Sequence, residues 1–202
     1  MALSASAAST ATFNGNVLSP NRATANGGAL HIAGAATVVF ASDQEFRGNS
    51  ARDGGAIWAE AFDNAPAHKL TFQSNSATGS GGALFINGRA RLSGAFTFAD
   101  NKAGAGGAVH AAADLEVSGG TFAKNQATDS GGAIHSMGTV TVGGGTFEPG
   151  NEAKGNGPNS GGGAIWAKII RVEAAGNDPV RFSGQIADRK STRLNSSHLA
   201  ES

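Results

Sequence analysis

Short runs of alternating apolar and polar residues recur along the whole chain. One kind of run starts with Gly-Gly-Ala and continues with Ile, Leu or Val, and a second kind ends in Phe-x-x-Asn. A third kind lies between them: "TVVF" at Thr37, "LEV" at Leu115, "TVTV" at Thr139 and "IIRV" at Ile169. A period of two residues between Gly, Asn, Ser and Asp is typical of β-strands. No useful length of chain shows the 3.6-residue period of a helix, so the pattern predicts an all-β fold.

The Gly-Gly-Ala motif occurs six times, and the intervals between its first glycines are 27, 27, 25, 25 and 31 residues. Its copies are Gly27, Gly28, Ala29; Gly54, Gly55, Ala56; Gly81, Gly82, Ala83; Gly106, Gly107, Ala108; Gly131, Gly132, Ala133; and Gly162, Gly163, Ala164. A unit of this length that repeats at near-constant spacing predicts a solenoid with one unit per turn.

The Phe-x-x-Asn motif accompanies it along the chain. Its copies are Phe13/Asn16, Phe46/Asn49, Phe72/Asn75, Phe98/Asn101 and Phe122/Asn125. A sixth copy, "FEPGN" from Phe147 to Asn151, is one residue longer, and "FSGQ" at Phe182 has Gln in place of Asn. The coupling of the two motifs over six units indicates that both belong to one structural repeat.

Three short strands per unit of about 25 residues predict a parallel β-helix of about six rungs, with strands roughly 4.8 Å apart. Equivalent residues then stack on one another. The phenylalanines are expected to form a buried column, and the asparagines to stack at a turn where their side chains bond neighbouring backbone. The paired glycines supply the backbone conformations of a second corner, where the adjoining alanine fits.

Two longer stretches are predicted to bulge from the coil as loops. They run from Ala61 to Lys69 and from Gly155 to Gly161. Loops on a solenoid are where specific recognition is usually found.

The residue after each Gly-Gly-Ala-[Ile/Leu/Val] is aromatic or histidine. The six residues are His31, Trp58, Phe85, His110, His135 and Trp166. If the branched residue points inward, its successor points outward, which predicts a surface stripe. Such a stripe is able to stack on sugar rings or to form a protein-binding face; alternatively, it is a self-stacking ladder that only stabilises the sheet.

Charge and composition narrow the function. Fifteen Lys plus Arg balance fifteen Asp plus Glu, and they are scattered. This argues against a nucleic-acid partner and against membrane contact by this chain itself. There is no cysteine, which excludes disulfides and thiol chemistry. The opening "MALSASAASTATF" lacks the basic and apolar regions of a secretion signal.

No cofactor, metal site or catalytic group is expected. His110 and His135 fall in adjacent rungs, but no carboxylate recurs at a fixed offset to complete a metal site. The acids Asp43, Asp53, Asp100, Asp114 and Asp129 occupy different positions of the repeat, whereas glycoside hydrolysis needs two facing carboxylates. We therefore expect a protein that is not an enzyme.

The alternating GGA[ILV] and FxxN tetrapeptides resemble the repeat of the chlamydial polymorphic membrane proteins, over roughly residues 13 to 186. Members of that family are autotransporter adhesins whose passenger is a right-handed, single-stranded, pectin-lyase-like β-helix exported through an outer-membrane barrel. The resemblance implies an extracellular or outer-membrane-surface location and a host-cell or matrix partner. It also implies that the motif residues take part in adhesion, although the same residues would be needed simply to build the coil.

Two other functions stay open at this point. A carbohydrate-binding or polysaccharide-degrading β-helix predicts acidic residues that converge in one groove. A purely structural solenoid predicts neither a groove nor an exposed aromatic patch.

The last segment departs from the repeat. "DRKSTRLNSSHLAES" has neither motif and resembles the in-frame translation of a sequencing-library adapter. We therefore expect residues 1–187 to form a β-helix repeat fragment of a longer chain and residues 188–202 to be a non-native tail.

Overall fold

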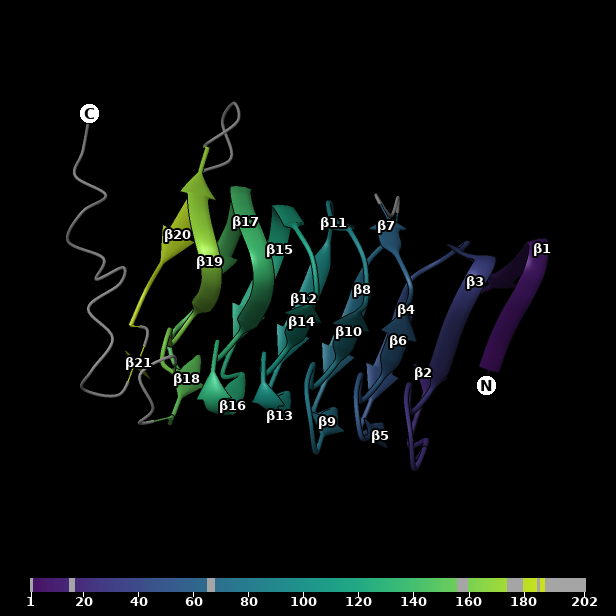
Figure 1. The fold of residues 1–202 in the computed structure, drawn as a ribbon, viewed down its shortest axis with the longest axis horizontal. Coiled ribbons are helices and arrows are strands. Elements are labelled where there is room, and N and C mark those ends of the chain that lie inside the picture. Colours follow the sequence, from purple (N-terminus) through teal and green to yellow (C-terminus); the bar gives the residue numbers. More distant parts are fainter. Residues whose placement is uncertain are drawn as a thin grey trace.

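The computed structural model describes residues 2–14, 17–64, 68–155, 160–173, 180–184 and 186–187. These residues form strands and turns and contain no helix, so within them no helical segment is available to cross a membrane. The strands are parallel and stack as a β-solenoid of about six turns, which lie side by side in Figure 1. The all-β fold and the parallel coil predicted from the sequence are thereby confirmed.

The first wall of the coil consists of the strands that follow Gly-Gly-Ala. They are β3 (Leu30–Phe40), β6 (Ile57–Ala59), β10 (Leu84–Ile86), β14 (Val109–Ala111), β17 (Ile134–Phe147) and β19 (Ile165–Val172). The first residue of each is a buried Leu, Ile or Val, and these residues pair with one another from rung to rung. Each unit of the sequence is therefore one turn.

The second wall comprises β7 (Phe62–Asn64), β11 (Ala90–Leu92), the start of β15 (Leu115–Ala123) and the continuations of β17 and β19. Phe62 pairs with Ala90 and is only 5% exposed. The prediction of a loop from Ala61 onward is wrong at this end, because Phe62 fills the coil. Residues 65–67 and 156–159 of the two predicted loops lie outside the described residues.

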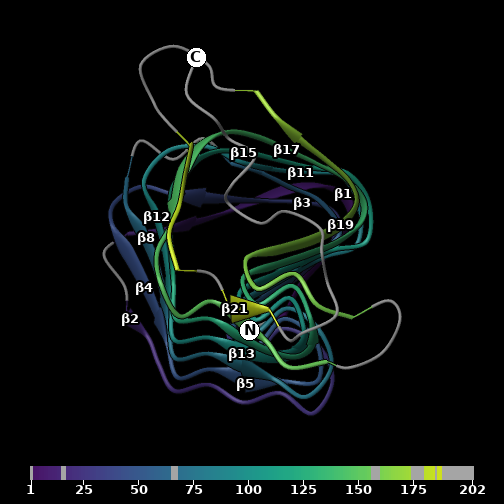
Figure 2. The same ribbon diagram turned by 90° about the vertical axis from the view of Figure 1, so that its left-hand side faces the viewer.

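The third wall carries the phenylalanines. Its strands are β2 (Val17–Leu18), β4 (Gln44–Arg47), β8 (Leu70–Gln73), β12 (Phe96–Ala99), the ends of β15 and β17, and β20 (Val180–Phe182). Phe46, Phe72, Phe98, Phe122 and Phe147 are directly in register. Figure 2 looks along the coil and shows the successive rungs overlying one another.

A fourth, short strand follows each asparagine from Asn49 to Asn151, and one more lies in the equivalent place near the end of the coil; these strands were not expected from the sequence. These strands form a separate six-stranded sheet: β5 (Ser50–Ala51), β9 (Ser76–Ala77), β13 (Lys102–Ala105), β16 (Gln126–Ser130), β18 (Glu152–Ala153) and β21 (Ile186–Ala187). Most contribute one buried alanine, such as Ala127 at 1% exposure. These strands have two to five residues, too few to show a clear alternating pattern. The rung therefore has a fourth strand in addition to the three that the sequence predicted.

The N-terminal end differs from the predicted register. Strand β1 (Ala2–Phe13) pairs with β3, and Phe13 lies beside Phe40 rather than in the phenylalanine column. The residue paired with Phe46 is Leu18, so the first corner is Leu18 to Asn21. Phe13/Asn16 is therefore wrong as the first copy of the motif, and Asn16 itself lies outside the described residues. The interval from Leu18 to Phe46 is 28 residues, whereas that from Phe13 to Phe46 is 33. The shorter interval is nearer to the spacing of the other copies, and it is the signal in the sequence that identifies the first corner.

Candidate functional site

The Gly-Gly-Ala residues form an interior corner of the coil. The first glycines have φ between 64° and 69°, the left-handed region that favours glycine. At the second position, a Cβ on Gly28, Gly55, Gly82, Gly107 or Gly132 would clash with the carbonyl oxygen of the equivalent glycine in the next rung. The alanines are at most 6% exposed. The motif is thus folded inward, and its small residues allow successive backbones to approach.

The phenylalanines of the third wall form a buried column. Phe46, Phe72, Phe98, Phe122 and Phe147 are 0% exposed, and neighbouring ring centroids are 4.8–5.0 Å apart. Phe182 extends the column at 4.7 Å from Phe147. Each buried side chain contributes about 1.5–3 kcal/mol to folding.

The asparagines of the second motif form a ladder of buried amides, hereafter the amide ladder. The backbone N–H and the Nδ2 of Asn75 both donate to Oδ1 of Asn101, each at 3.0 Å. Nδ2 of Asn101 also donates to the carbonyl oxygen of Phe72 at 3.0 Å. The ladder comprises Asn21, Asn49, Asn75, Asn101, Asn125 and Asn151. Each amide joins consecutive rungs, and from Asn49 to Asn151 all are 0% exposed.

The six residues that follow the branched positions stack into a continuous aromatic ladder of His31, Trp58, Phe85, His110, His135 and Trp166. Neighbouring centroids are 4.4–6.2 Å apart and the planes differ by 2–14°. Both faces of each inner ring are covered by its neighbours, so no inner ring offers a free face to a sugar. Two of its rings are buried, against the prediction of a surface stripe: His110 and His135 are 8% and 7% exposed, whereas the other four rings are partly exposed. A role for its edges in partner binding stays a prediction.

His110 and His135 contact each other directly within this ladder. Their Nδ1 atoms are 3.1 Å apart, a contact that requires one ring to donate and the other to accept. Burial, reinforced by the neighbouring His135, lowers the pKa of His110 to about 4, against a small opposing effect of Asp53. Burial likewise lowers the pKa of His135 to about 4, opposed by Asp129. Both imidazoles are therefore neutral at pH 7.

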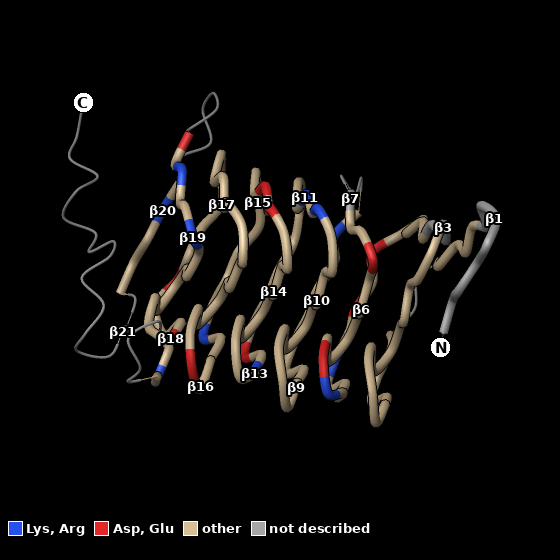
Figure 3. The backbone as a smooth tube through the Cα atoms, in the orientation of Figure 1, with Lys and Arg blue, Asp and Glu red and all other residues tan. Residues whose placement is uncertain are grey.

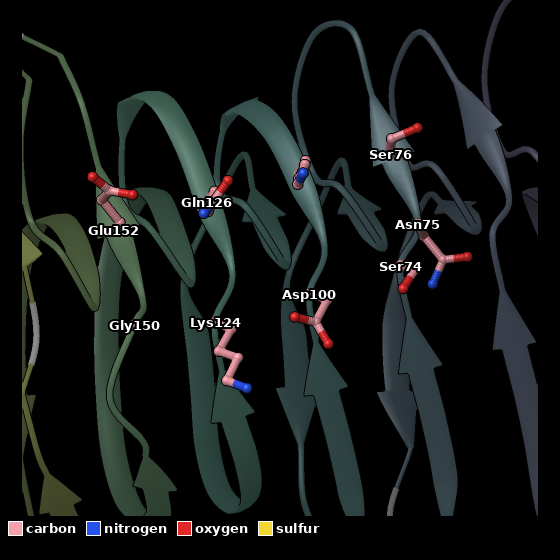
Figure 4. Close-up of a pocket in the computed structure, with 9 residues that line it drawn as sticks. Ser74, Asn75, Ser76, Asp100, Lys124, Gln126, Gly150 and Glu152 are labelled. Atoms are coloured by element: carbon pink, nitrogen blue, oxygen red, sulfur yellow. The ribbon is translucent and has the colours of Figure 1, made fainter.

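Charged and polar side chains gather at the corner where the third wall turns into the short sheet. Figure 4 shows them in two rows that cross successive rungs. They line a depression of about 600 Å³, hereafter the corner depression; among its lining residues are Ser74, Ser76, Asp100, Lys102, Lys124, Gln126 and Glu152. Sequence reasoning missed this site, because its residues share no type from rung to rung.

The backbone of this corner is left-handed immediately before the five asparagines from Asn49 to Asn151. Gly48 and Gly150 have φ of 63° and 87°, but Ser74, Asp100 and Lys124 take φ of 55°, 58° and 55° at the same repeat position. Residues with a Cβ are disfavoured in this conformation. Lysine and serine lack the tolerance for it that asparagine and aspartate have. The non-glycine residues occupy three consecutive rungs of the corner depression.

Charges elsewhere are scattered, as Figure 3 shows for the described residues. No group of three or more His, Asp or Glu in the described part of the chain is placed to hold a metal ion. The exposed pair of Arg91 and Glu116, with N and O 2.8 Å apart, joins neighbouring rungs of the second wall. Such exposed pairs contribute little to stability.

Residues 45–60, 69–87 and 119–137 match the family model of the Chlamydia polymorphic membrane protein repeat. Comparison with curated proteins and with solved structures gives no match. Each matched stretch runs from the phenylalanine strand through the amide ladder and the glycine corner to the aromatic ladder. The matched stretches thus coincide with residues that build successive turns, and at these three places the chain is similar to the chlamydial polymorphic membrane protein repeat.

Proposed function

We propose that this chain is part of the passenger of an autotransporter-like protein displayed on the outer surface of a bacterial cell. The observation that carries the proposal is the triple match to the polymorphic membrane protein repeat on a regular β-solenoid. A solenoid is a quasi-one-dimensional scaffold with a long lateral surface, which suits display away from a membrane. The repeat and the fold fit a surface protein without enzymatic activity.

We further propose that the displayed coil adheres to a host-cell or extracellular-matrix component. The described Gly-Gly-Ala and Phe-x-x-Asn residues are almost all buried, so they support adhesion by shaping the coil rather than by touching the partner. Contact then falls to the variable side chains between the motifs. On this proposal, loss of a motif residue lowers adhesion only as far as it unfolds the coil.

Adhesion is tested with beads that carry the purified chain, counted on cultured epithelial cells and on matrix-coated plates. Beads with the folded chain should bind, and soluble folded chain should compete with them, whereas heat-unfolded chain should not. Gly107→Ala is the unfolding variant, and Gly143→Ala is its matched control. Binding no better than that of albumin-coated beads would contradict adhesion and favour a purely structural solenoid.

Surface display is tested separately, with antibodies against the chain on intact cells of the source bacterium. Labelling of intact cells, lost after brief treatment with external protease, is expected. Labelling that appears only after the cells are permeabilised would contradict the proposed location.

A further inference from the structure

We propose that the corner depression binds an acidic sugar unit, a saccharide that carries one carboxylate beside several hydroxyl groups. This inference builds on the proposed adhesive function, because it names the class of surface component that the coil recognises. It rests on three observations: the backbone conformation of the corner, the unpaired charges in it, and the groups left free to bind.

At the repeat position immediately before the asparagine, three rungs have a residue with a side chain although the backbone conformation favours glycine. Gly48 and Gly150 show that glycine fits this repeat position, yet Ser74, Asp100 and Lys124 hold it in the three rungs between them. All three residues line the corner depression. Aspartate adopts this conformation more readily than serine or lysine. Its retention at Ser74 and Lys124, where it is disfavoured, points to a role of these side chains other than folding.

The charges in the depression are incompletely matched. Glu152 has a partner, because its carboxylate lies 3.6 Å from Nζ of Lys154. Asp100, Lys102 and Lys124 form no ion pair and no side-chain hydrogen bond with the residues that the structure describes. Two ammonium groups and one carboxylate leave one unmatched positive charge, which complements a ligand with a single negative charge.

The other polar groups that line the corner depression suit a ligand with hydroxyl groups better than an added peptide strand. The backbone N–H groups of Ser74 and Asp100 donate to the carbonyl oxygens of Ala99 and Ala123, at 3.0 and 3.1 Å. An added peptide strand would therefore find these amides occupied. The Asp100 carboxylate, the Gln126 amide and the Ser76 hydroxyl are side-chain donors and acceptors of the kind that bind sugar hydroxyls.

The depression has no aromatic ring in its lining, so a bound sugar gains no stacking energy. A single unit is therefore expected to bind weakly, with a Kd on the order of millimolar. Many copies of the chain on one cell surface would raise the effective affinity through multivalency.

The test uses the full 202-residue chain and two soluble probes, 3′-sialyllactose and neutral lactose, with binding measured by ligand-observed NMR titration. Sialyllactose should bind at least about tenfold more tightly than lactose. Lys102→Gln removes an unmatched ammonium group at a strand position, and should weaken sialyllactose binding by about tenfold at unchanged Tm. Lys69→Gln, which removes a lysine outside the corner depression, is the matched control and should change neither quantity.

Lys124→Gly gives the sharpest result, because it removes a binding group while relieving the backbone. Its Tm should rise and its affinity for sialyllactose should fall. Equal binding of the two probes, wild-type affinity in both variants, or a lower Tm in Lys124→Gly would each overturn the inference.

The outcomes also separate this inference from the proposed adhesion. If the chain binds sialyllactose but its beads do not bind cells, adhesion fails and the sugar site stands. If beads bind cells and neither sialyllactose nor sialidase treatment reduces binding, adhesion stands and the sugar site is refuted.

Discussion

A single asparagine side chain satisfies the polar groups of three rungs at once. Oδ1 of Asn101 accepts from the backbone N–H and from Nδ2 of Asn75, while its own Nδ2 donates to Phe72 and to Asn125. The residue is 0% exposed, so no water replaces these bonds if they are lost. A buried donor without a partner costs about 1–3 kcal/mol.

Replacement of Asn101 by alanine is therefore expected to lower the free energy of unfolding by about 3 kcal/mol or more, measured by urea denaturation. Asn87→Ala is the matched control, since Nδ2 of Asn87 makes an exposed hydrogen bond to Glu60. The control should change stability by less than about 0.5 kcal/mol. Equal effects of the two substitutions would show that the amide ladder is not a principal source of stability.

The burial of His110 and His135 makes stability depend on pH. The folded pKa of each imidazole lies near 4, below the 6.5 that is usual for histidine in an unfolded chain, so the unfolded chain binds more protons between these two pH values. Their contribution to stability is complete above pH 6.5 and is lost as the pH falls toward 4. The expected slope is at most about 1.4 kcal/mol per pH unit for each imidazole.

Thermal or urea unfolding at pH 7, 6, 5 and 4.5 measures this slope. His135→Phe places in this rung the ring type that Phe85 already supplies to the ladder, and should reduce the slope to about half. The double change with His110→Phe should remove most of it. An unchanged slope in the double variant would assign the acid sensitivity to other groups.

At the scale of the elements, the glycine corner fixes how closely two rungs approach. A Cβ on Gly107 would clash with the carbonyl oxygen of Gly132 and crowd the backbone of Gln126. Neither obstacle is the end of a flexible side chain, so the rungs would have to separate. Gly107→Ala is expected to cost at least about 3 kcal/mol, seen as a large fall in Tm.

Gly143 provides the comparison within the same protein. Its φ is not in the left-handed region, and the nearest atom to an added Cβ is the Glu173 carbonyl oxygen at 3.3 Å. Gly143→Ala should therefore alter Tm by a few degrees at most. If it proved as damaging as Gly107→Ala, close rung packing at the corner would not explain the motif.

The strands that could be predicted from the sequence are those with a repeated residue type. Phe, Asn and Gly-Gly-Ala mark the third wall and the two corners because stacking places like residues on like. Strands β5 and β9 escaped detection because two residues show no period. Phe62 of β7 escaped detection because its partner in the next rung is Ala90, and the partner of Ala90 in the rung after that is Leu115, so the residue type changes from rung to rung. Leu18 substitutes for Phe at the first corner, so Phe13 supplied a false match.

The candidate site was harder to predict for a related reason. The aromatic ladder was visible as a series, although the burial of His110 and His135 was not predicted from it. The corner depression combines Ser, Asp, Lys, Gln and Glu at two repeat positions. Its members become a group only when the rungs are stacked, and side chains that vary from copy to copy give no periodic signal.

At the scale of the whole molecule, each rung contacts chiefly the rung before and the rung after it. Local opening should therefore begin at the ends of the coil and proceed inward. The amides of Gly28, Gly55, Gly82, Gly107 and Gly132 report on this, because each donates to the next rung in the same way, at 3.0–3.2 Å.

Hydrogen exchange is expected to be slowest at Gly82 and Gly107 and faster toward Gly28, since the central rungs are covered on both sides. Exchange followed by mass spectrometry or NMR measures the gradient. Equal protection at all five glycines would mean that the coil unfolds only as one cooperative unit.

The direction of the amide ladder also bears on how long such a coil is able to be. From Asn21 to Asn125, Nδ2 of each ladder asparagine donates to Oδ1 of the asparagine in the following rung, so the junctions along the ladder are interchangeable. Removing residues 102–125 would bring the donors of Asn101 to the Oδ1 that now serves Asn125, that of Asn151. The length of the coil therefore changes in steps of about 4.8 Å, and it is set by the number of repeats and not by a change within any one of them.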